Sequence, residues 1–144
     1  MELLLCSLEK TLQYVTHKIT DTSIVSENKT STKLSSCPYC QSVSEKVYSR
    51  YYRTIYDLPM LDYETAIHLR LKKIFCVEPS CSHKTFSELL SFLDGNSRQT
   101  KRLKAEIFRL SLEMSSASHY LAKNHIKMSK SSICRMIKKR HTYR

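Results

Sequence analysis

The chain has 144 residues, which is enough for one ordinary domain or two small ones. It contains a single glycine, Gly95, which excludes a glycine-rich phosphate loop and a dinucleotide fingerprint, and with them most nucleotide-binding enzymes. The net charge of +11 is uneven, because residues 1–97 hold 11 basic and 11 acidic residues, whereas residues 98–144 hold 13 basic residues and two acidic ones. Clustered lysine and arginine favour a polyanionic partner over a merely solvated surface, because they neutralise phosphates and release counterions.

The longest apolar run near the N-terminus is "LLLC", Leu3 to Cys6, and the acidic Glu2 precedes it. This run is too short for the hydrophobic region of a signal peptide or for a membrane-spanning helix. We therefore expect a cytoplasmic protein without a membrane partner. In that compartment, six cysteines favour metal ligands or free thiols over a disulfide framework.

Residues 1–36 are predicted to be an N-terminal segment followed by a polar linker. Leu5, Leu8, Leu12, Val15 and Ile19 fall at helical spacing, which predicts a short amphipathic helix. The stretch "SENKTSTKLSS" that follows is rich in serine, threonine and lysine, as linkers are.

Residues 37–94 change character and favour antiparallel strands. The stretch "VYSRYYRTIYDLP" is rich in tyrosine and β-branched residues, and "TAIHLRLKKIFC" alternates, with Ile67, Leu69 and Leu71 on one face. This period of two indicates half-buried strands. The pattern of "TFSELLSFL" does not decide between a strand and a strand that continues into a short helix.

Residues 95–144 have a helical period. The first helix is predicted to begin at Asn96 as N-cap, with Gln99 closing a capping pair, and to bury Leu103, Ile107, Leu110 and Met114. A second helix is predicted over 116–124 and a third over about 129–140. The short connection "NHIKMS" between the last two helices favours a helix-turn-helix unit.

The tetrapeptide "CPYC", Cys37 to Cys40, fits either a redox dithiol or half of a zinc site. A redox dithiol follows a buried strand and begins a helix, which lowers the pKa of its first thiol. Here a polar stretch precedes the motif and a β-prone stretch follows it. A second pair, Cys76 and Cys81 in "CVEPSC", completes four thiolates for one tetrahedral zinc ion, so that zinc is favoured over redox chemistry.

A four-cysteine zinc site is structural, because no coordination position is left for water or substrate. We expect the cofactor to be one structural Zn²⁺ and chelation to unfold residues 37–92. His83 could replace one cysteine as a ligand, but a surface histidine is favoured. Cys6 and Cys134 lack partners at ligand spacing and are expected to be small apolar residues or free thiols.

Several of these residues together resemble a known family. The sequence "CPYC…YSRYYRTIYDLP…LRLKKIFC…CSHKTFSE" resembles the N-terminal zinc ribbon of bacterial insertion-sequence transposases of the ISL-three group. The resemblance rests on the two cysteine pairs and on three further motifs: Tyr51, Arg53, Asp57, Leu58 and Pro59; Phe75 and Cys76; Phe86 and Glu88.

The resemblance covers roughly residues 36–140 and implies the fold and the function. The implied fold class is α+β, a small four-cysteine zinc ribbon of antiparallel strands followed by a three-helix helix-turn-helix domain. The implied function is sequence-specific binding of double-stranded DNA at the terminal inverted repeats of a transposon, in the bacterial cytoplasm at the nucleoid. Homo-oligomers or the full-length transposase are possible further partners.

The family's catalytic domain, an RNase-H-like fold with three metal-binding acidic residues, has no counterpart in this sequence. We therefore expect no enzymatic activity and assign no catalytic residue. The chain is predicted to be the DNA-recognition part alone.

In a helix-turn-helix, the last helix presents its early, outward residues to base edges in the major groove. Arg135 is the first candidate for reading a base, since arginine can bind guanine bidentately. Truncation of Arg135 should relax specificity, whereas truncation of Lys139 should weaken binding to all sequences alike. The base-facing candidates are Lys130, Ser131, Ser132 and Arg135, and the phosphate-contacting candidates are Lys138, Lys139, Arg140, Lys101 and Arg102.

Other basic residues lie on the predicted strand over 66–75, where Arg70, Lys72 and Lys73 could add a second phosphate contact. Arg53 and Asp57 are expected to pair with each other.

Two alternative functions remain open. A zinc-ribbon adaptor or transcriptional regulator that binds protein or RNA would associate only weakly with duplex DNA. A small redox enzyme would turn over thiols and hold no zinc.

Overall fold

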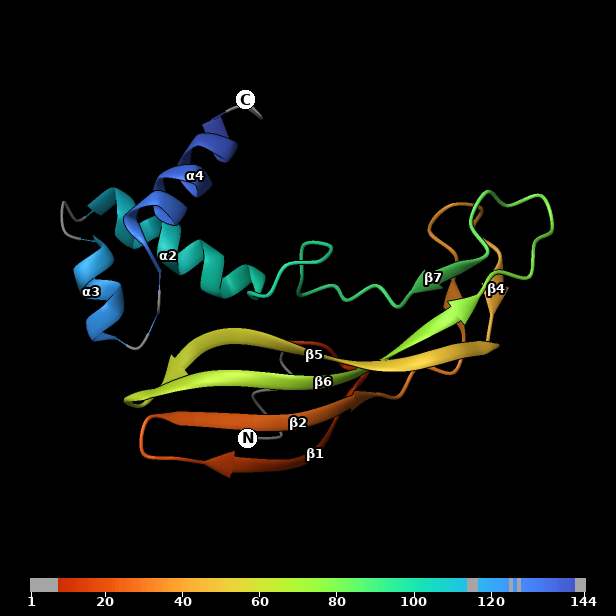
Figure 1. Cartoon of the computed structure of the whole chain (residues 1–144), viewed down its shortest axis with the longest axis horizontal. Coiled ribbons are helices and arrows are strands. Elements are labelled where there is room, and N and C mark those ends of the chain that lie inside the picture. The colour runs from red at the N-terminus through yellow and green to blue at the C-terminus, as the bar shows by residue number, and fades with distance from the viewer. Residues whose placement is uncertain (1–7, 114–116, 125, 127, 142–144) are drawn as a thin grey trace.

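The computed structural model describes residues 8–113, 117–124, 126 and 128–141, and these form a mixed α+β structure. A five-stranded sheet occupies the N-terminal two thirds, and three helices follow it (Figure 1). The helices lie toward one end of the long sheet strands, and the short strands β4 and β7 lie toward the other. Within the described ranges, no helix is both long enough and apolar enough to span a membrane.

The predicted N-terminal helix and linker are wrong for the described residues. Strand β1, Leu12–Ile19, pairs antiparallel with β2, Ser23–Thr30. The leucines at positions 3–5, with the rest of residues 1–7, lie outside the described residues.

Strand β2 was not predicted from the sequence, because most of its buried side chains are polar. Ile24, Ser26, Asn28 and Thr30 alternate toward the interior, and only the first of them is apolar. The Asn28 amide nitrogen donates a hydrogen bond of 2.9 Å to the Ser26 hydroxyl. Small polar side chains that bond within the sheet therefore occupy positions where an amphipathic strand would carry valine or isoleucine.

The centre of the sheet is a long hairpin. Strand β5, Val47–Met60, runs antiparallel to β6, Tyr63–Phe75, and β2 pairs with β6 in parallel. The tight turn between β5 and β6 places Leu61 at a positive φ of 54°. The antiparallel hairpin was predicted from the sequence, whereas the parallel neighbour was not.

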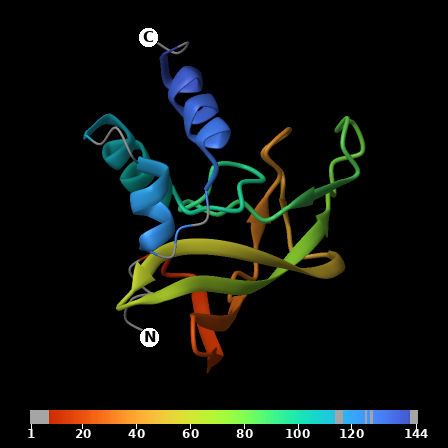
Figure 2. The same ribbon diagram turned by 60° about the vertical axis from the view of Figure 1, so that its left-hand side comes forward.

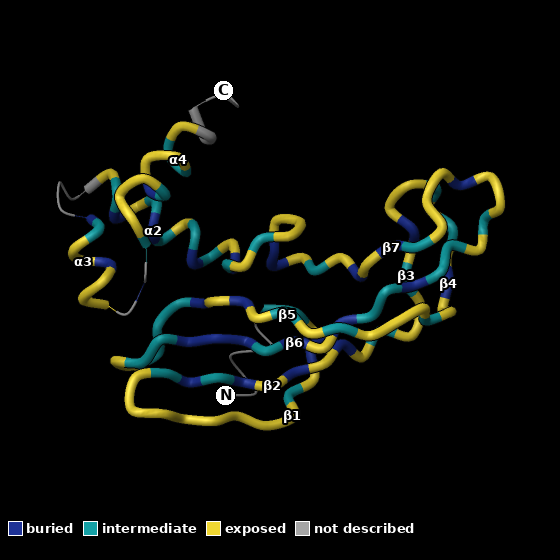
Figure 3. The backbone as a smooth tube through the Cα atoms, viewed as in Figure 1, coloured by how far each residue is buried: buried dark blue, intermediate teal, exposed yellow. Residues whose placement is uncertain are grey.

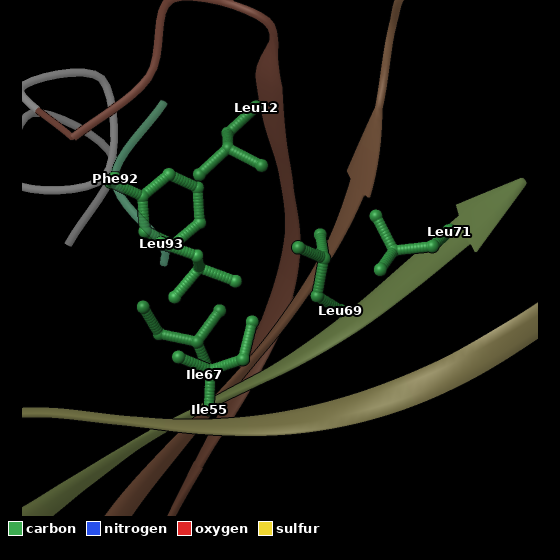
Figure 4. Close-up of a cluster of buried hydrophobic side chains, with 7 residues drawn as sticks. All are labelled: Leu12, Ile55, Ile67, Leu69, Leu71, Phe92 and Leu93. Carbon is green, nitrogen blue, oxygen red and sulfur yellow. The ribbon is translucent and has the colours of Figure 1, made fainter. Parts of the chain in front are cut away.

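The alternation predicted for β6 is confirmed. Ile67, Leu69 and Leu71 are all 1% exposed or less and point to the same face as Ile55 of β5. Phe92 and Leu93, from the segment between the sheet and the helices, cover this face together with Leu12 (Figure 4). We call this cluster the sheet core. Figure 3 shows the contrast between the largely buried β6 and the largely exposed β1.

The segment between β6 and the first described helix contains a short strand and no helix. Strand β7, Thr85–Ser87, pairs antiparallel with the end of β6. Residues 88–100 then run as turns and irregular chain to the first described helix. Two-residue strands β3, Ser35–Ser36, and β4, Val43–Ser44, form a separate small ladder.

The C-terminal helices are α2, Lys101–Glu113, α3, Ala117–Lys123, and α4, Lys130–His141. The N-cap of α2 is Thr100, whose hydroxyl accepts a hydrogen bond from the Leu103 backbone nitrogen at 3.2 Å. The predicted cap at Asn96 is therefore wrong.

The three helices share one apolar cluster, which joins them to one another. It contains Leu103, Ile107, Leu110, Leu121, Ile126 and Ile133. Figure 2 shows the helices gathered together on one side of the sheet. Leu58 of β5 packs against the same cluster, so that the helices and the sheet are in contact.

Candidate metal centre and nucleic-acid interface

Four cysteines from two distant segments meet at one end of the sheet. The sulfur atoms of Cys37, Cys40, Cys76 and Cys81 all lie within 4.8 Å of one another. The Sγ atoms of Cys37 and Cys81 are 3.9 Å apart, and those of Cys40 and Cys76 are 3.4 Å apart. The grouping predicted from the sequence is confirmed.

Each cysteine pair is held by a tight turn. The Gln41 backbone nitrogen donates to the Cys37 carbonyl at 2.9 Å, and the Cys37 nitrogen donates to the Ser42 carbonyl at 2.8 Å. Gln41 adopts a positive φ of 63°, which closes the first turn over the sulfurs. In the second turn, the Cys76 nitrogen donates to the Lys84 carbonyl at 2.9 Å.

A small apolar cluster, separate from the sheet core, supports the sulfurs. Cys37 and Cys81 are buried against Ile74 of β6 and Phe86 of β7. Cys40 and Cys76 are only partly buried. The end of the central hairpin therefore carries one cysteine pair and packs against the other.

Two of the four thiols, Cys40 and Cys81, have pKa values shifted in opposite directions. Hydrogen bonds to the side chain and backbone of Ser42 lower the pKa of Cys40 to about 6. A backbone hydrogen bond from His83 lowers the pKa of Cys81, but burial and the neighbouring thiols outweigh it and raise that pKa to about 12. Four thiolates this close repel one another unless a cation lies between them.

This donor set fits zinc. Four thiolates about 2.3 Å from a tetrahedral ion lie about 3.8 Å from one another, which is close to the two measured sulfur separations. Four protein ligands leave no position for water, so that the zinc is structural.

His83 and Cys134 are not members of this cluster. The ring of His83 stacks on Tyr39, with centroids 3.5 Å apart, and its Nδ1 lies 2.9 Å from the Ser82 hydroxyl. Cys134 is exposed on α4. Cys6 lies outside the described residues.

Asp57 and Arg53 do not pair with each other, and the expectation of such a pair is wrong. The Arg53 guanidinium donates to the Ser97 carbonyl at 2.8 Å. The buried Asp57 carboxylate instead accepts hydrogen bonds from Thr100 and from two nitrogens of Arg102.

This ion pair involves Arg102, which was predicted from the sequence to contact a DNA phosphate. Arg102 is half-buried and joins α2 to the sheet, and Asp57 raises its pKa mainly through the hydrogen bonds. Its neighbour Lys101 is more exposed and donates to the Ser91 carbonyl at 2.7 Å.

The remaining predicted DNA contacts lie on α4. Ser129 caps this helix through a hydrogen bond from the Ser132 backbone nitrogen at 3.2 Å, and the two hydroxyls lie 3.0 Å apart. Ser132 is half-buried. The exposed members of the predicted set are Lys130, Ser131, Arg135 and Lys138. Lys139 and Arg140 also belong to α4, but their side chains are outside the described part.

Sequence reasoning missed some residues near these sites. The hydroxyl of Ser42 lies 3.0 Å from the Cys40 sulfur and 3.3 Å from the Cys76 sulfur. Its position directly after the first cysteine pair was the available signal. Lys29 and Arg50 were also missed, and they lie beside Arg70 and Lys72 in one shallow pocket of about 210 Å³.

One family model matches this part of the chain. The model is described as the zinc-finger of transposase IS204/IS1001/IS1096/IS1165, and it matches residues 33–82. No curated protein and no solved structure matches the chain. The matched segment holds all four clustered cysteines and the central hairpin. Residues 33–82 are therefore a zinc finger of the ISL3 transposase family, with Cys37, Cys40, Cys76 and Cys81 as the site of one structural zinc ion.

Proposed function

We propose that the chain binds double-stranded DNA in a sequence-specific manner, as the end-recognition part of an insertion-sequence transposase. In this proposal α3 and α4 form a helix-turn-helix, and α4 enters the major groove. The target class is the terminal inverted repeat of a transposon. Only the zinc-finger segment matches a known family model, and no catalytic role is proposed.

The packing of the three helices supports this proposal. Helix α3 ends at Lys123, and a short connection leads to α4 at Lys130. Within this connection Ile126 is buried in the helical cluster, and its backbone nitrogen donates a hydrogen bond to the Leu121 carbonyl at 2.8 Å. This contact holds Ile126 against α3, and recognition of a groove requires the last helix to be presented in a defined orientation.

The observation that carries the proposal is the exposed face of α4. Ile133 is buried, and Met136 and Ile137 pack beside it on the helical cluster. At 100° per residue, Ser131, Arg135 and Lys138 lie on the opposite side of the helix, and all three are exposed. The sequence of the helix contains no acidic residue, so that its charged side chains are all basic.

The predicted DNA contacts have different proposed roles. Arg135 projects from the middle of the helix and is proposed to read a base. Lys130, Lys138, Lys139 and Arg140 are proposed to contact phosphates, as is Lys101 of α2. Arg102 is proposed to position α2, since Asp57 already occupies its guanidinium. Ser132 is likewise assigned to the helix cap.

The proposed division of the chain is a zinc-ribbon domain over 37–94 and a DNA-binding domain over 95–144. The contact between Asp57 and Arg102 crosses that boundary, which would fix the two parts relative to each other. Strands β1 and β2 extend the sheet of the zinc-ribbon part.

The exposed thiol of Cys134 provides a direct test, because it lies one residue before Arg135 on α4. Duplexes selected from a random library by the zinc-loaded protein should slow alkylation of Cys134, measured by mass spectrometry in a Cys6→Ser background. A scrambled duplex at the same salt concentration is the control. Equal alkylation rates with the selected and scrambled duplexes, at saturating DNA, would contradict the assignment of α4.

A second measurement distinguishes DNA recognition from a zinc-ribbon adaptor that binds protein or RNA. The logarithm of the duplex binding constant should fall linearly with the logarithm of salt concentration, by about 0.9 per phosphate contact. Weak binding that does not respond to salt would favour the adaptor.

A further inference from the structure

The two faces of the sheet differ sharply. One face is covered by the sheet core, in which Phe92 and Leu93 pack on β5 and β6. No apolar cluster of the described residues covers the other face, which we call the open face. The register of β2, β5 and β6 assigns to it, among others, these residues: Glu27, Lys29, Arg50, Tyr52, Thr54, His68, Arg70 and Lys72.

The open face brings four cations together from three strands. Lys29 of β2 lies directly opposite Arg70 of β6, and Arg50 of β5 lies directly opposite Lys72 of β6. All four line the same pocket of about 210 Å³. Like charges directly opposite each other destabilise a sheet, so that two such neighbouring pairs favour an anion above them.

Three of these cations are available to an external anion. No described residue forms an ion pair with Lys29, Arg50 or Arg70. Lys72 differs, because its ammonium group contacts the Thr32 carbonyl and lies 3.8 Å from the Glu88 carboxylate. Glu27, which is directly opposite His68 in the register, is an acidic residue on the same face.

An exposed aromatic ring lies beside the cations. Tyr52 of β5 is directly opposite Arg70, and its side chain is 60% exposed. The imidazole of His68 meets this ring edge-on, with centroids 4.9 Å apart. This contact supports the ring from one side and leaves it outside any apolar cluster of the described residues.

We propose that the open face is a binding surface for single-stranded DNA, separate from the duplex-binding surface proposed for α4. The phosphodiester backbone would follow Lys29, Arg70 and Arg50, and an unstacked base would lie on Tyr52. Neighbouring strands are about 4.8 Å apart, so that Tyr52 and Lys29 flank Arg70 within about 10 Å, a span comparable to one or two nucleotides.

The tyrosine favours a single strand over a duplex. The bases of a duplex are stacked on one another, so that their faces cannot contact an aromatic ring on a sheet. In a single strand each base has a free face, and stacking on an aromatic side chain combined with cationic backbone contacts is the usual mode of binding. The choice of DNA over RNA rests on the proposed function of the chain.

The test compares Tyr52→Ala with Tyr52→Phe in the full zinc-loaded chain, by fluorescence anisotropy with labelled oligothymidine of about 12 nucleotides. Tyr52→Ala should weaken binding by about 5- to 150-fold, whereas Tyr52→Phe, which keeps the ring, should bind like the unchanged chain. Arg70→Ala should weaken binding and reduce its salt dependence, and Arg70→Lys should retain much of both.

Control variants separate this surface from other parts of the protein. Tyr39→Ala removes a similarly exposed tyrosine at the zinc end, and Lys84→Ala removes an exposed lysine there, and neither should change oligothymidine binding. Zinc content and thermal unfolding of every variant should match the unchanged chain. A variant that fails this check is replaced by Tyr52→Leu, which keeps apolar bulk and removes the aromatic ring.

The outcomes distinguish this proposal from the duplex proposal. Loss of oligothymidine binding in Tyr52→Ala, with duplex binding retained, supports the open face whatever happens in the variants of α4. Equal weakening of duplex and single-stranded binding would show a general phosphate contact and overturn the proposal. Absence of oligothymidine binding by the unchanged chain, or tighter binding of oligouridine than of oligothymidine, would overturn it as well.

Discussion

The guanidinium of Arg102 donates hydrogen bonds from two nitrogens to the carboxylate of Asp57, and this pair joins α2 to the end of β5. The Nε–Oδ1 distance is 2.8 Å, and Thr100 donates a further bond of 2.7 Å to the same oxygen. The carboxylate side chain is 3% exposed, so that water cannot replace these donors. One acidic residue therefore fixes the start of α2 both through its cap and through its first turn.

Arg102→Ala should destabilise the protein strongly, because it leaves a buried carboxylate without its charged partner. The expected cost is about 3 kcal/mol in the free energy of unfolding, measured by urea denaturation with zinc present. Arg102→Lys keeps the charge but loses the bidentate geometry and should cost less.

The exposed pair of Glu106 and Arg109 on the same helix is the matched control. Its geometry is also good, at 2.7 Å, but both side chains are at least one third exposed, so that Arg109→Ala should cost about 0.5 kcal/mol. Similar costs for the Arg102→Ala and Arg109→Ala variants would contradict the role assigned to Asp57.

The two pairs should also differ in their response to pH. Arg109 lowers the pKa of Glu106 through hydrogen bonds, so that its small contribution is present above the unfolded pKa and is lost as the pH falls through the folded value. Asp57 raises the pKa of Arg102 further above neutrality, so that the contribution of this guanidinium is fully present throughout the range from about pH 5 to 9. The check is unfolding of the Arg109→Ala variant and of the unchanged chain at several pH values, where the difference between them should shrink in acid.

Glu88 is a second buried carboxylate that joins separate strands. It accepts bonds from the Thr30 hydroxyl at 2.8 and 3.0 Å and from the Lys72 backbone nitrogen at 2.8 Å. Glu88→Ala should leave these donors unpaired at the junction of β2, β6 and β7, at a cost of about 3 kcal/mol. The measurement is the midpoint of thermal unfolding, compared with the exposed control Glu78→Ala. If the midpoint of thermal unfolding shifts no more in Glu88→Ala than in Glu78→Ala, Glu88 does not stabilise the junction of β2, β6 and β7.

The parts of the fold that could be predicted are those encoded by a local sequence pattern, whereas strands that depend on a distant partner could not be predicted. Ile67, Leu69 and Leu71 alternate with polar residues, so that β6 was recognisable from its own local pattern. Three of the four buried residues of β2, Ser26, Asn28 and Thr30, are polar, so that the sequence of this strand resembles that of a linker. Their role comes from a parallel partner about 40 residues away in the chain, and no local pattern encodes it.

In the candidate sites, too, the features with a local sequence pattern were predictable, and the contacts between distant residues were not. Cys37 and Cys40 pair with Cys76 and Cys81 by a rule of spacing that zinc imposes, and this rule is visible in the sequence. The partner of Asp57 was misassigned because Arg53 lies on the same strand, four residues away, whereas Arg102 reaches Asp57 only through the folding of residues 88–100. The cations of the open face likewise come from three strands, one of which was unrecognised.

Zinc removal should affect the two ends of the sheet unequally. The cysteines pack on Ile74 and Phe86, whereas the sheet core has its own apolar cluster around Leu69. A strong chelator should therefore raise amide hydrogen exchange first in residues 35–46 and 75–87, and later in the centre of β6. The sequence predicts that chelation unfolds the whole of residues 37–92, whereas the structure limits the first effect to the zinc end of the sheet.

The matched variants are Cys76→Ser and Cys134→Ser. The first should abolish stoichiometric zinc in elemental analysis, and the second should retain one zinc per chain because its thiol is exposed on α4. Retention of zinc in Cys76→Ser, or unchanged exchange after chelation, would contradict a structural four-cysteine site.

Arg135 and Lys130 should respond differently when duplex binding is measured across sequences. Arg135→Ala should cost about 1–3 kcal/mol on the selected duplex and much less on scrambled DNA, because the loss is confined to a base contact. Lys130→Ala should weaken both duplexes alike and reduce the salt slope by about one contact. Both residues are exposed on α4 and outside the helical cluster, so that neither change should alter unfolding. Indistinguishable profiles for the two variants on selected and scrambled DNA would remove the separate roles assigned to them and leave α4 as a general phosphate contact.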